Sequence, residues 1–113
     1  MNPAAARAAG EQVLARLRAE AARYGVALPG LAWDVAQFDL QRDPASGHDA
    51  LLARWQCAGR RVQLTLRPDG HVYGECDLLL DHPARPGFWM DTLAVWGLPP
   101  DLRSEPNLIV KPA

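Results

Sequence analysis

Two tight turns within residues 51–80 restrict the fold of this chain more than any other feature. Residues 67–71 read RPDGH: proline presets φ at the first turn position, aspartate supports the turn, and glycine accepts a positive φ. A three-residue loop with a glycine bulge then pairs Arg67 with His71. The further cross-strand pairs that this turn predicts are Leu66–Val72, Leu64–Gly74, Val62–Cys76, Thr65–Tyr73, Gln63–Glu75 and Arg61–Asp77.

The second turn is predicted at Gly59–Arg60, because glycine in the first central position suits a type II′ hairpin. This turn would pair Cys57 with Val62 and Trp55 with Leu64. A slip of one residue would place Val62 and Leu64 in water, so both turns assign the same side chains to the same face. The sequence therefore predicts three antiparallel strands with one apolar and one polar face.

The apolar face of these strands needs a covering element, whereas the polar face should meet water or a partner. Gly74 leaves a gap beside Leu64 on the apolar face, and Trp55 is expected to cover it. The polar face is predicted to carry Arg54, Gln56, Arg61, Gln63, Thr65, Arg67, His71, Tyr73, Glu75 and Asp77.

The covering element is predicted to be a helix over residues 3–24. Asn2 can cap this helix, Pro3 suits its first turn, and Gly25 is a C-terminal stop. Its apolar residues recur at helical spacing and form one narrow stripe, which we expect to lie on the apolar face of the sheet. The stripe consists of Val13, Leu14, Leu17, Ala21 and Tyr24.

The remaining segments are less regular. Residues 31–40 alternate imperfectly and predict a strand, and residues 41–49 contain Asp-Pro, Ser and Gly, which favour a loop. Residues 88–96 suit a strand or a helix: Trp, Thr and Val favour the strand, while the glycine and prolines that follow resemble a helix stop. Residues 98–113 contain four prolines and predict an irregular tail, in which an apolar patch at 108–110 docks as a short edge strand.

These elements predict an α+β fold, with one N-terminal helix packed on an antiparallel β-meander of four to five strands. The sheet would occupy residues 31–97. A chain of 113 residues is long enough for one domain with a real core but not for two, so a single domain is expected over residues 1–113.

Charge and hydropathy restrict the partners and the compartment. The formal net charge of −1 gives no basic excess, so neither nucleic acid nor a membrane surface is expected as a partner. The N-terminal residues lack the apolar run of a signal peptide, and no stretch approaches the length of a membrane span. We therefore expect a cytoplasmic protein. Arginine supplies nearly all of the 12 basic residues, which favours a GC-rich bacterial genome.

The two cysteines are predicted to be free and buried. In the predicted register Cys57 and Cys76 lie two strand spacings apart, with roughly 9–10 Å between their Cα atoms, whereas a disulfide needs less than about 7 Å. The chain has no paired Cys or His at zinc-site spacing and no phosphate-binding glycine loop. We therefore expect neither a metal nor a cofactor.

Candidate catalytic groups each have a simpler structural explanation. Glu75 and Asp77 lie two apart on one face and could serve acid–base chemistry, but Gln63 and Arg61 are predicted opposite them as solvated cross-strand partners. Asp81 precedes a histidine, yet neighbours in an extended chain rarely present their side chains to each other. We assign no catalytic residue, and an enzyme is the less favoured reading.

The function that these patterns favour is a non-enzymatic binding module that acts through a protein partner or as a homodimer. Four of the eight aromatic residues are Trp, a residue enriched at interfaces. The alternative is a small-molecule site or minor enzyme on the polar sheet face near the 41–49 loop, using His48, His71, Tyr73 and Glu75. The candidate partner or ligand surface comprises His48, His71, Tyr73, Glu75, Asp77, Arg54, Trp89 and Trp96.

Overall fold

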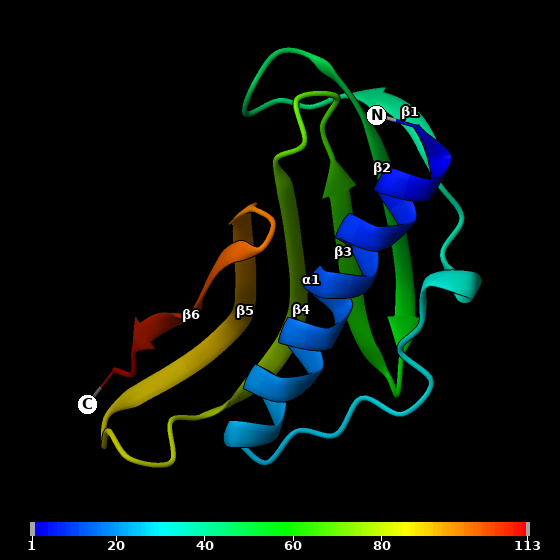
Figure 1. Cartoon of the computed structure of the whole chain (residues 1–113). Coiled ribbons are helices and arrows are strands. Elements are labelled where there is room, and N and C mark those ends of the chain that lie inside the picture. Colours follow the sequence, from blue (N-terminus) through cyan, green and yellow to red (C-terminus); the bar gives the residue numbers. More distant parts are fainter. Residues whose placement is uncertain (1, 113) are drawn as a thin grey trace.

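The computed structural model of the chain describes residues 2–112 and consists of one long helix and one antiparallel sheet (Figure 1). The helical segments are α1 (Pro3–Arg23) and the short 3₁₀ helix η1 (Trp33–Val35). The strands are β1 (Asp39–Arg42), β2 (Asp49–Cys57), β3 (Arg60–Leu66), β4 (Val72–Asp81), β5 (Phe88–Leu98) and β6 (Asp101–Val110).

The six strands lie side by side in the order of the sequence, β1 to β6, and every neighbouring pair is antiparallel. The predicted α+β class and the meander are therefore confirmed, but the predicted number of four to five strands is too small. Within the described residues, no helix combines the length and the apolar character needed to cross a membrane.

The turn between β3 and β4 has the predicted register. Arg67 N–H donates to the His71 carbonyl at 3.0 Å, and Leu66 lies opposite Val72, with the alternation continuing to Val62 opposite Cys76. The RPDGH motif therefore correctly predicts both the position of the hairpin and the faces of its two strands.

The turn between β2 and β3 lies one residue earlier than predicted. Its central residues are Ala58–Gly59, with φ values of 51° and 77°, and two positive φ values are typical of a type I′ turn rather than the type II′ turn predicted at Gly59–Arg60. Trp55 consequently lies opposite Val62 instead of Leu64. Because the register shifts by two residues, the same side chains still point to the apolar face.

The segment predicted as a strand at residues 31–40 forms a strand only from Asp39 onward. Trp33 lies in η1 and its ring packs 4.7 Å from the ring of Phe38, centroid to centroid. The Trp33 ring also lies against Gly10 of α1, where any side chain would overlap it. Packing against the helix therefore overrides the strand propensity of this segment.

The region predicted as an irregular tail at residues 98–113 contains the edge strand β6, which pairs with β5 along its length. Pro106 is compatible with this strand because an edge strand has a neighbour on one side only, so a residue without an N–H can face the other side. Leu108–Val110, predicted as a short edge strand, is the last part of β6. Ala113, which the prediction included, lies outside the described residues.

Helix α1 begins and ends where its capping residues predict. Ala5 N–H donates to Asn2 Oδ1 at 2.8 Å, Pro3 occupies the first turn, and Gly25 follows the helix with a φ of 78°. The Val26 N–H donates to the Ala21 carbonyl at 3.0 Å and closes the C-terminal end. Local sequence signals thus fix both ends of α1.

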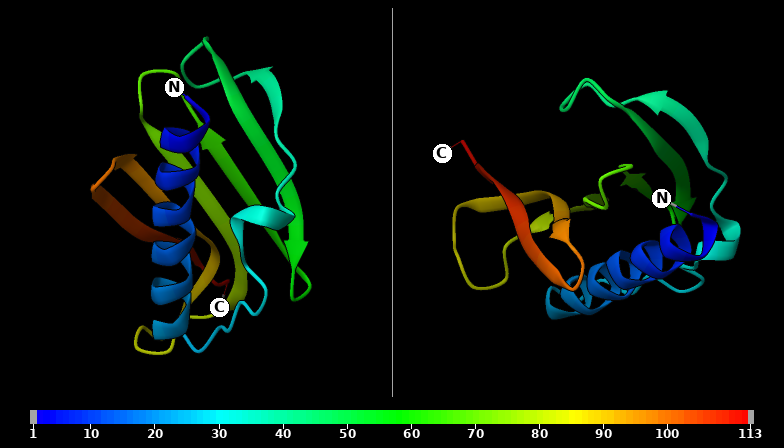
Figure 2. Two further views of the ribbon diagram at one scale, coloured as in Figure 1. Left: turned by 45° about the vertical axis from the view of Figure 1, so that its right-hand side comes forward. Right: turned by 45° about the horizontal axis from the view of Figure 1, so that its top comes forward.

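The apolar stripe of α1 covers one face of the sheet, where the helix contacts β3, β4, β5 and β6. Figure 2 shows α1 on one side of the sheet in both views. Val13, Leu14 and Leu17 are almost completely buried. A side chain at Gly74 would overlap Val13 and lie 3.3 Å from Leu17 Cδ1, so the helix fills the gap that Trp55 was predicted to cover.

This close approach gives a prediction about stability. Gly74→Ala should lower the free energy of unfolding by about 1–3 kcal/mol, because the added methyl group overpacks the contact with Val13. Urea denaturation of the variant and the wild type measures the change.

The double variant Gly74→Ala/Val13→Ala provides the matched control. Removing the Val13 methyl groups makes room for the new side chain, so the double variant should lose less stability than the sum of the two single variants. Equal stability of Gly74→Ala and the wild type would contradict the contact.

Candidate functional site

The face of the sheet opposite α1, here called the open face, carries a band of half-buried side chains. The register places Leu52, Thr65, Tyr73 and Trp96 in one row across β2, β3, β4 and β5, and we call these four residues the aromatic row. Thr65 is only 6% exposed, and the other three are half-buried. Tyr73 and Trp96 lie directly opposite each other, so their rings are neighbours on this face.

A row of polar side chains runs beside the aromatic row. Arg54 Nε donates to Gln63 Oε1 at 3.1 Å, and the Tyr73 hydroxyl donates to Glu75 Oε2 at 3.1 Å. Glu75 thus accepts its hydrogen bond from a member of the aromatic row rather than from the Gln63 predicted opposite it. The members of this polar row are Arg54, Gln63, Glu75 and Glu105, with the apolar Ala94 between the last two.

Asp77 forms the predicted ion pair with Arg61. Asp77 Oδ2 accepts from Arg61 Nε at 3.0 Å and from the Arg61 backbone N–H at 3.3 Å. The Asp77 side chain is 8% exposed and that of Arg61 is 77% exposed, so the arginine reaches over a buried carboxylate. Glu75 and Asp77 therefore have separate hydrogen-bond donors and do not form a carboxylate pair of the acid–base type.

Several hollows lie on the open face. A small one beside the β1–β2 loop, of about 110 Å³, is lined by residues that include Asp43, Arg54 and Thr65, and two others are larger. One, of about 360 Å³, is lined by residues that include Arg54, Glu75 and Asp77. The other, of about 550 Å³, is lined by residues that include Tyr73 and Trp96. Both are also lined by Thr92, so the polar and aromatic parts of the face adjoin there.

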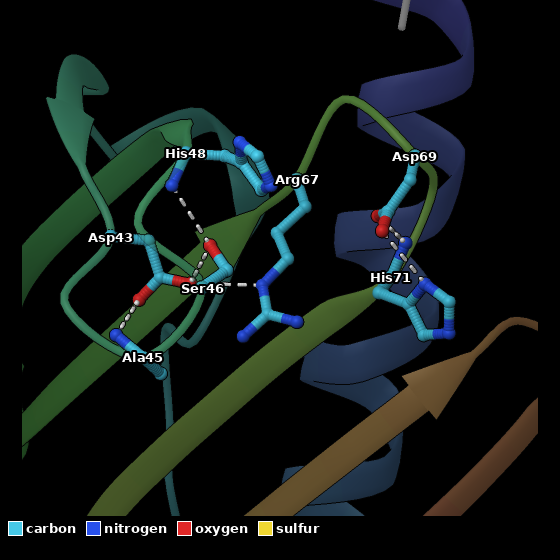
Figure 3. A network of polar contacts seen from close by, with 7 residues as sticks. All are labelled: Asp43, Ala45, Ser46, His48, Arg67, Asp69 and His71. Atoms are coloured by element: carbon cyan, nitrogen blue, oxygen red, sulfur yellow. Dashed lines mark hydrogen bonds and ion pairs between the residues drawn. The ribbon is translucent and has the colours of Figure 1, made fainter.

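The predicted histidines lie at one end of the sheet, in two separate groups (Figure 3). His48 ends the β1–β2 loop, where its backbone N–H donates to Ser46 Oγ at 3.3 Å. His71 lies on the β3–β4 turn and contacts Asp69, with its backbone N–H 2.9 Å from Asp69 Oδ1. Neither histidine is among the described residues that line the two hollows, so His48 and His71 are not brought together with Tyr73.

The β1–β2 loop is tied to the neighbouring turn. Asp43 Oδ2 accepts from Ser46 Oγ and from Arg67 Nε, each at 2.9 Å. The hydrogen bond from Ser46 is the main reason why the pKa of Asp43 is lowered. These contacts explain the polar cluster in Figure 3 as a support for the loop.

Trp89 and Trp96 lie near opposite ends of β5. An uninterrupted strand would point them to opposite faces, but Met90 and Leu93 are both fully buried although they are three residues apart. The register shift between them changes the phase of the alternation. Trp89 and Trp96 therefore share the open face, with Trp89 opposite Asp81 and Ile109.

Three buried or half-buried groups of the sheet, Tyr73, Cys76 and Cys57, have a raised pKa. Burial, together with the nearby Glu75 carboxylate, raises the pKa of Tyr73 to about 12. Burial, together with Asp77, raises the pKa of the Cys76 thiol to about 12, and burial also raises that of Cys57. Both cysteines are buried and free, and a protonated thiol is a poor nucleophile.

Several members of the open face do not appear in the sequence prediction. Thr92 and Ala94 could have been predicted, because every second residue before Trp96 on a strand lies on the same face as Trp96. Arg103 and Glu105 belong to β6, where prolines conceal the strand pattern. The polar face was therefore correctly predicted on β2 to β4 and missed on β5 and β6.

Among residues 2–112, no three His, Cys, Asp or Glu side chains gather closely enough to hold a metal ion. Comparison with protein families, with curated proteins and with solved structures gives no match to this chain. The chemistry of the open face is therefore the basis on which a function has to be assigned.

The environment of Tyr73 predicts a pH dependence of stability. Its pKa rises from an ordinary 10.0 to about 12 on folding, so the protonated phenol stabilises the folded state. That contribution is fully present below pH 10.0 and is lost as the pH rises through about 12.

Ultraviolet absorbance should be titrated for the wild type and for Tyr73→Phe. The difference between the two titration curves should show a tyrosinate transition near pH 12. The loss of unfolding free energy in alkaline solution should also be smaller in Tyr73→Phe than in the wild type. A midpoint close to the ordinary value would show that Tyr73 is neither buried nor bonded to Glu75.

Proposed function

We propose that this chain is a non-enzymatic binding module that holds another protein against the aromatic row of its open face. The observation that carries this proposal is the pairing of Tyr73 with Trp96 on a sheet face that no described helix covers. Large amphipathic rings of this kind are enriched at the energetic centres of protein interfaces.

The arrangement around the two rings supports the same function. Protein interfaces combine an apolar centre with a polar rim whose hydrogen bonds are satisfied. On the open face the aromatic row supplies the centre, and the Arg54–Gln63 contact belongs to the adjoining rim. Because Tyr73 and Trp96 are already half-buried, holding them in place on binding costs little side-chain entropy.

The state of the titratable groups favours binding over catalysis. A general base or nucleophile has to be free to accept or release a proton near neutral pH. Glu75 instead accepts from Tyr73, and Asp77 accepts from Arg61. The pKa of the Cys76 thiol is raised to about 12, which leaves it protonated.

The test compares serine substitutions of the two tryptophans of β5, Trp96 and Trp89. Immobilised wild-type protein should capture a stoichiometric partner from a lysate of the cells that make it, and Trp96→Ser should lose that partner at least tenfold, the scale of an interface hot spot. Trp89→Ser, near the other end of β5, should retain it.

Circular dichroism of both variants checks that they are folded. The proposal fails if the wild type captures no stoichiometric partner, or if Trp96→Ser and Trp89→Ser retain the partner equally well.

A second candidate function is a small-molecule site in the hollow lined by Arg54, Glu75 and Asp77. Its volume of about 360 Å³ lies within the range of ligand pockets. A metabolite that binds there should raise the melting temperature of the wild type. Glu75→Gln should abolish this rise, while the ligand-free melting temperature stays nearly unchanged because glutamine still accepts from Tyr73. If no compound of a broad metabolite panel raises the melting temperature, this candidate is wrong.

A further inference from the structure

The second surface of interest is the free edge of the sheet, which is separate from the aromatic row. Strand β6 forms this edge with ten residues, Asp101–Val110, whereas β1 at the other edge has only four. A long edge strand presents unpaired backbone groups that can bind another strand. The two edges of this sheet therefore differ greatly in their capacity to pair.

The direction of the backbone groups of β6 follows from its contacts with β5. Lys111 N–H donates to the Gly87 carbonyl at 2.9 Å, so odd-numbered residues direct their backbone groups toward β5. Even-numbered residues then direct theirs to the free edge, because the two orientations alternate in an antiparallel ladder. Pro106 is consistent with this assignment, since its missing N–H falls on the free side.

We propose that two copies of this chain pair through β6, antiparallel, about a two-fold axis at Ser104. Antiparallel pairing of identical edges requires a two-fold axis perpendicular to the sheet, so that each contact occurs twice. Residues that face each other across this axis have their side chains on the same face of the joined sheet only when the axis passes through a residue, not between two residues. The possible registers are therefore few, and their charges can be compared directly.

The charges favour the axis at Ser104. This register places Arg103 opposite the partner's Glu105 and Glu105 opposite the partner's Arg103, on the same face of the joined sheet. Both side chains are exposed, and within the described part of the chain neither one has an ion-pair partner of its own. Opposite charges on facing residues stabilise a strand pair, and like charges destabilise it.

The other registers are worse. An axis at Leu102 also opposes Arg103 to the partner's Asp101, but only residues 101–103 of the two β6 strands would then face each other. An axis at Leu108 opposes Glu105 to the partner's Lys111, which is already paired with Asp81. An axis at Arg103 places that arginine against its own copy and Asp101 against the partner's Glu105. An axis at Glu105 places this glutamate against its own copy. An axis at Pro106 opposes Arg103 to the partner's Ile109 and puts two residues without an N–H at the centre of the interface.

The backbone groups agree with the same register. Ser104 would exchange two N–H···O bonds with the partner's Ser104, because even-numbered residues face the edge. Leu102 would face the partner's Pro106, which has no N–H to donate, and the Leu102 N–H already donates to the Pro100 carbonyl of its own chain at 2.9 Å. The Leu102 carbonyl would therefore receive no hydrogen bond from the partner. It already accepts one within its own chain, from Arg16 Nη1 of α1 at 3.4 Å.

A charge-swap series measured by sedimentation equilibrium tests the proposal. The wild type should be a dimer. Arg103→Glu and Glu105→Arg should each weaken dimerisation by about tenfold or more, because each creates two like-charge pairs across the axis. The double variant Arg103→Glu/Glu105→Arg should recover the wild-type dissociation constant, since it exchanges the charges and restores both pairs.

Arg42→Glu on β1 is the matched control, because it reverses an arginine on the other edge strand and should leave the dimer unchanged. Ser104→Pro removes the two central N–H donors and should also dissociate the dimer, independently of charge. Circular dichroism confirms that each variant is folded.

A monomeric wild type, a dimer insensitive to Arg103→Glu, or a double variant that fails to recover would each overturn the proposal. Because β6 pairing leaves Tyr73 and Trp96 uncovered, these outcomes do not affect the test of the open face, where Trp96→Ser should lose the partner and remain dimeric.

Discussion

The contact of α1 with the backbone at Gly74 determines how this small domain is divided into two faces. Val13 occupies the place where any other residue at position 74 would carry its side chain, so the helix lies directly on β4. Strand alternation then sends every second side chain into the core. The remaining side chains of the sheet form the open face, which neither α1 nor the short η1 covers. Both the aromatic row and the polar row exist because one helix covers one face.

Much of this division could be predicted from the sequence because turns and helix caps are local. The RPDGH motif specifies the β3–β4 hairpin, and Asn2 and Gly25 specify the ends of α1. The β2–β3 turn shows the limit of local reasoning: Ala58 adopts a positive φ, which its residue type does not predict. The error changed the pairing of Trp55 without changing its face, because a register shift of two residues preserves the alternation.

The features that could not be predicted depend on contacts between distant segments. Trp33 leaves strand geometry to pack against Gly10, and β6 exists because β5 offers it an edge despite its prolines. The bulge in β5 brings Trp89 to the same face as Trp96, which no periodicity in residues 88–96 reveals. For the same reason the candidate surface was predicted on β2 to β4 and at Trp89 and Trp96 of β5, whereas its continuation over Thr92, Ala94 and β6 was missed.

The order of the strands also has a consequence for how the chain folds during synthesis. Each strand pairs with its neighbour in sequence, so every hairpin can close soon after its second strand leaves the ribosome, with little loop entropy to overcome. Helix α1 precedes the sheet in the chain, but its contacts with the sheet begin at β3 and β4. Most of the stability of a helix comes from packing its apolar face, so α1 acquires its lasting stability only when the middle of the sheet has emerged.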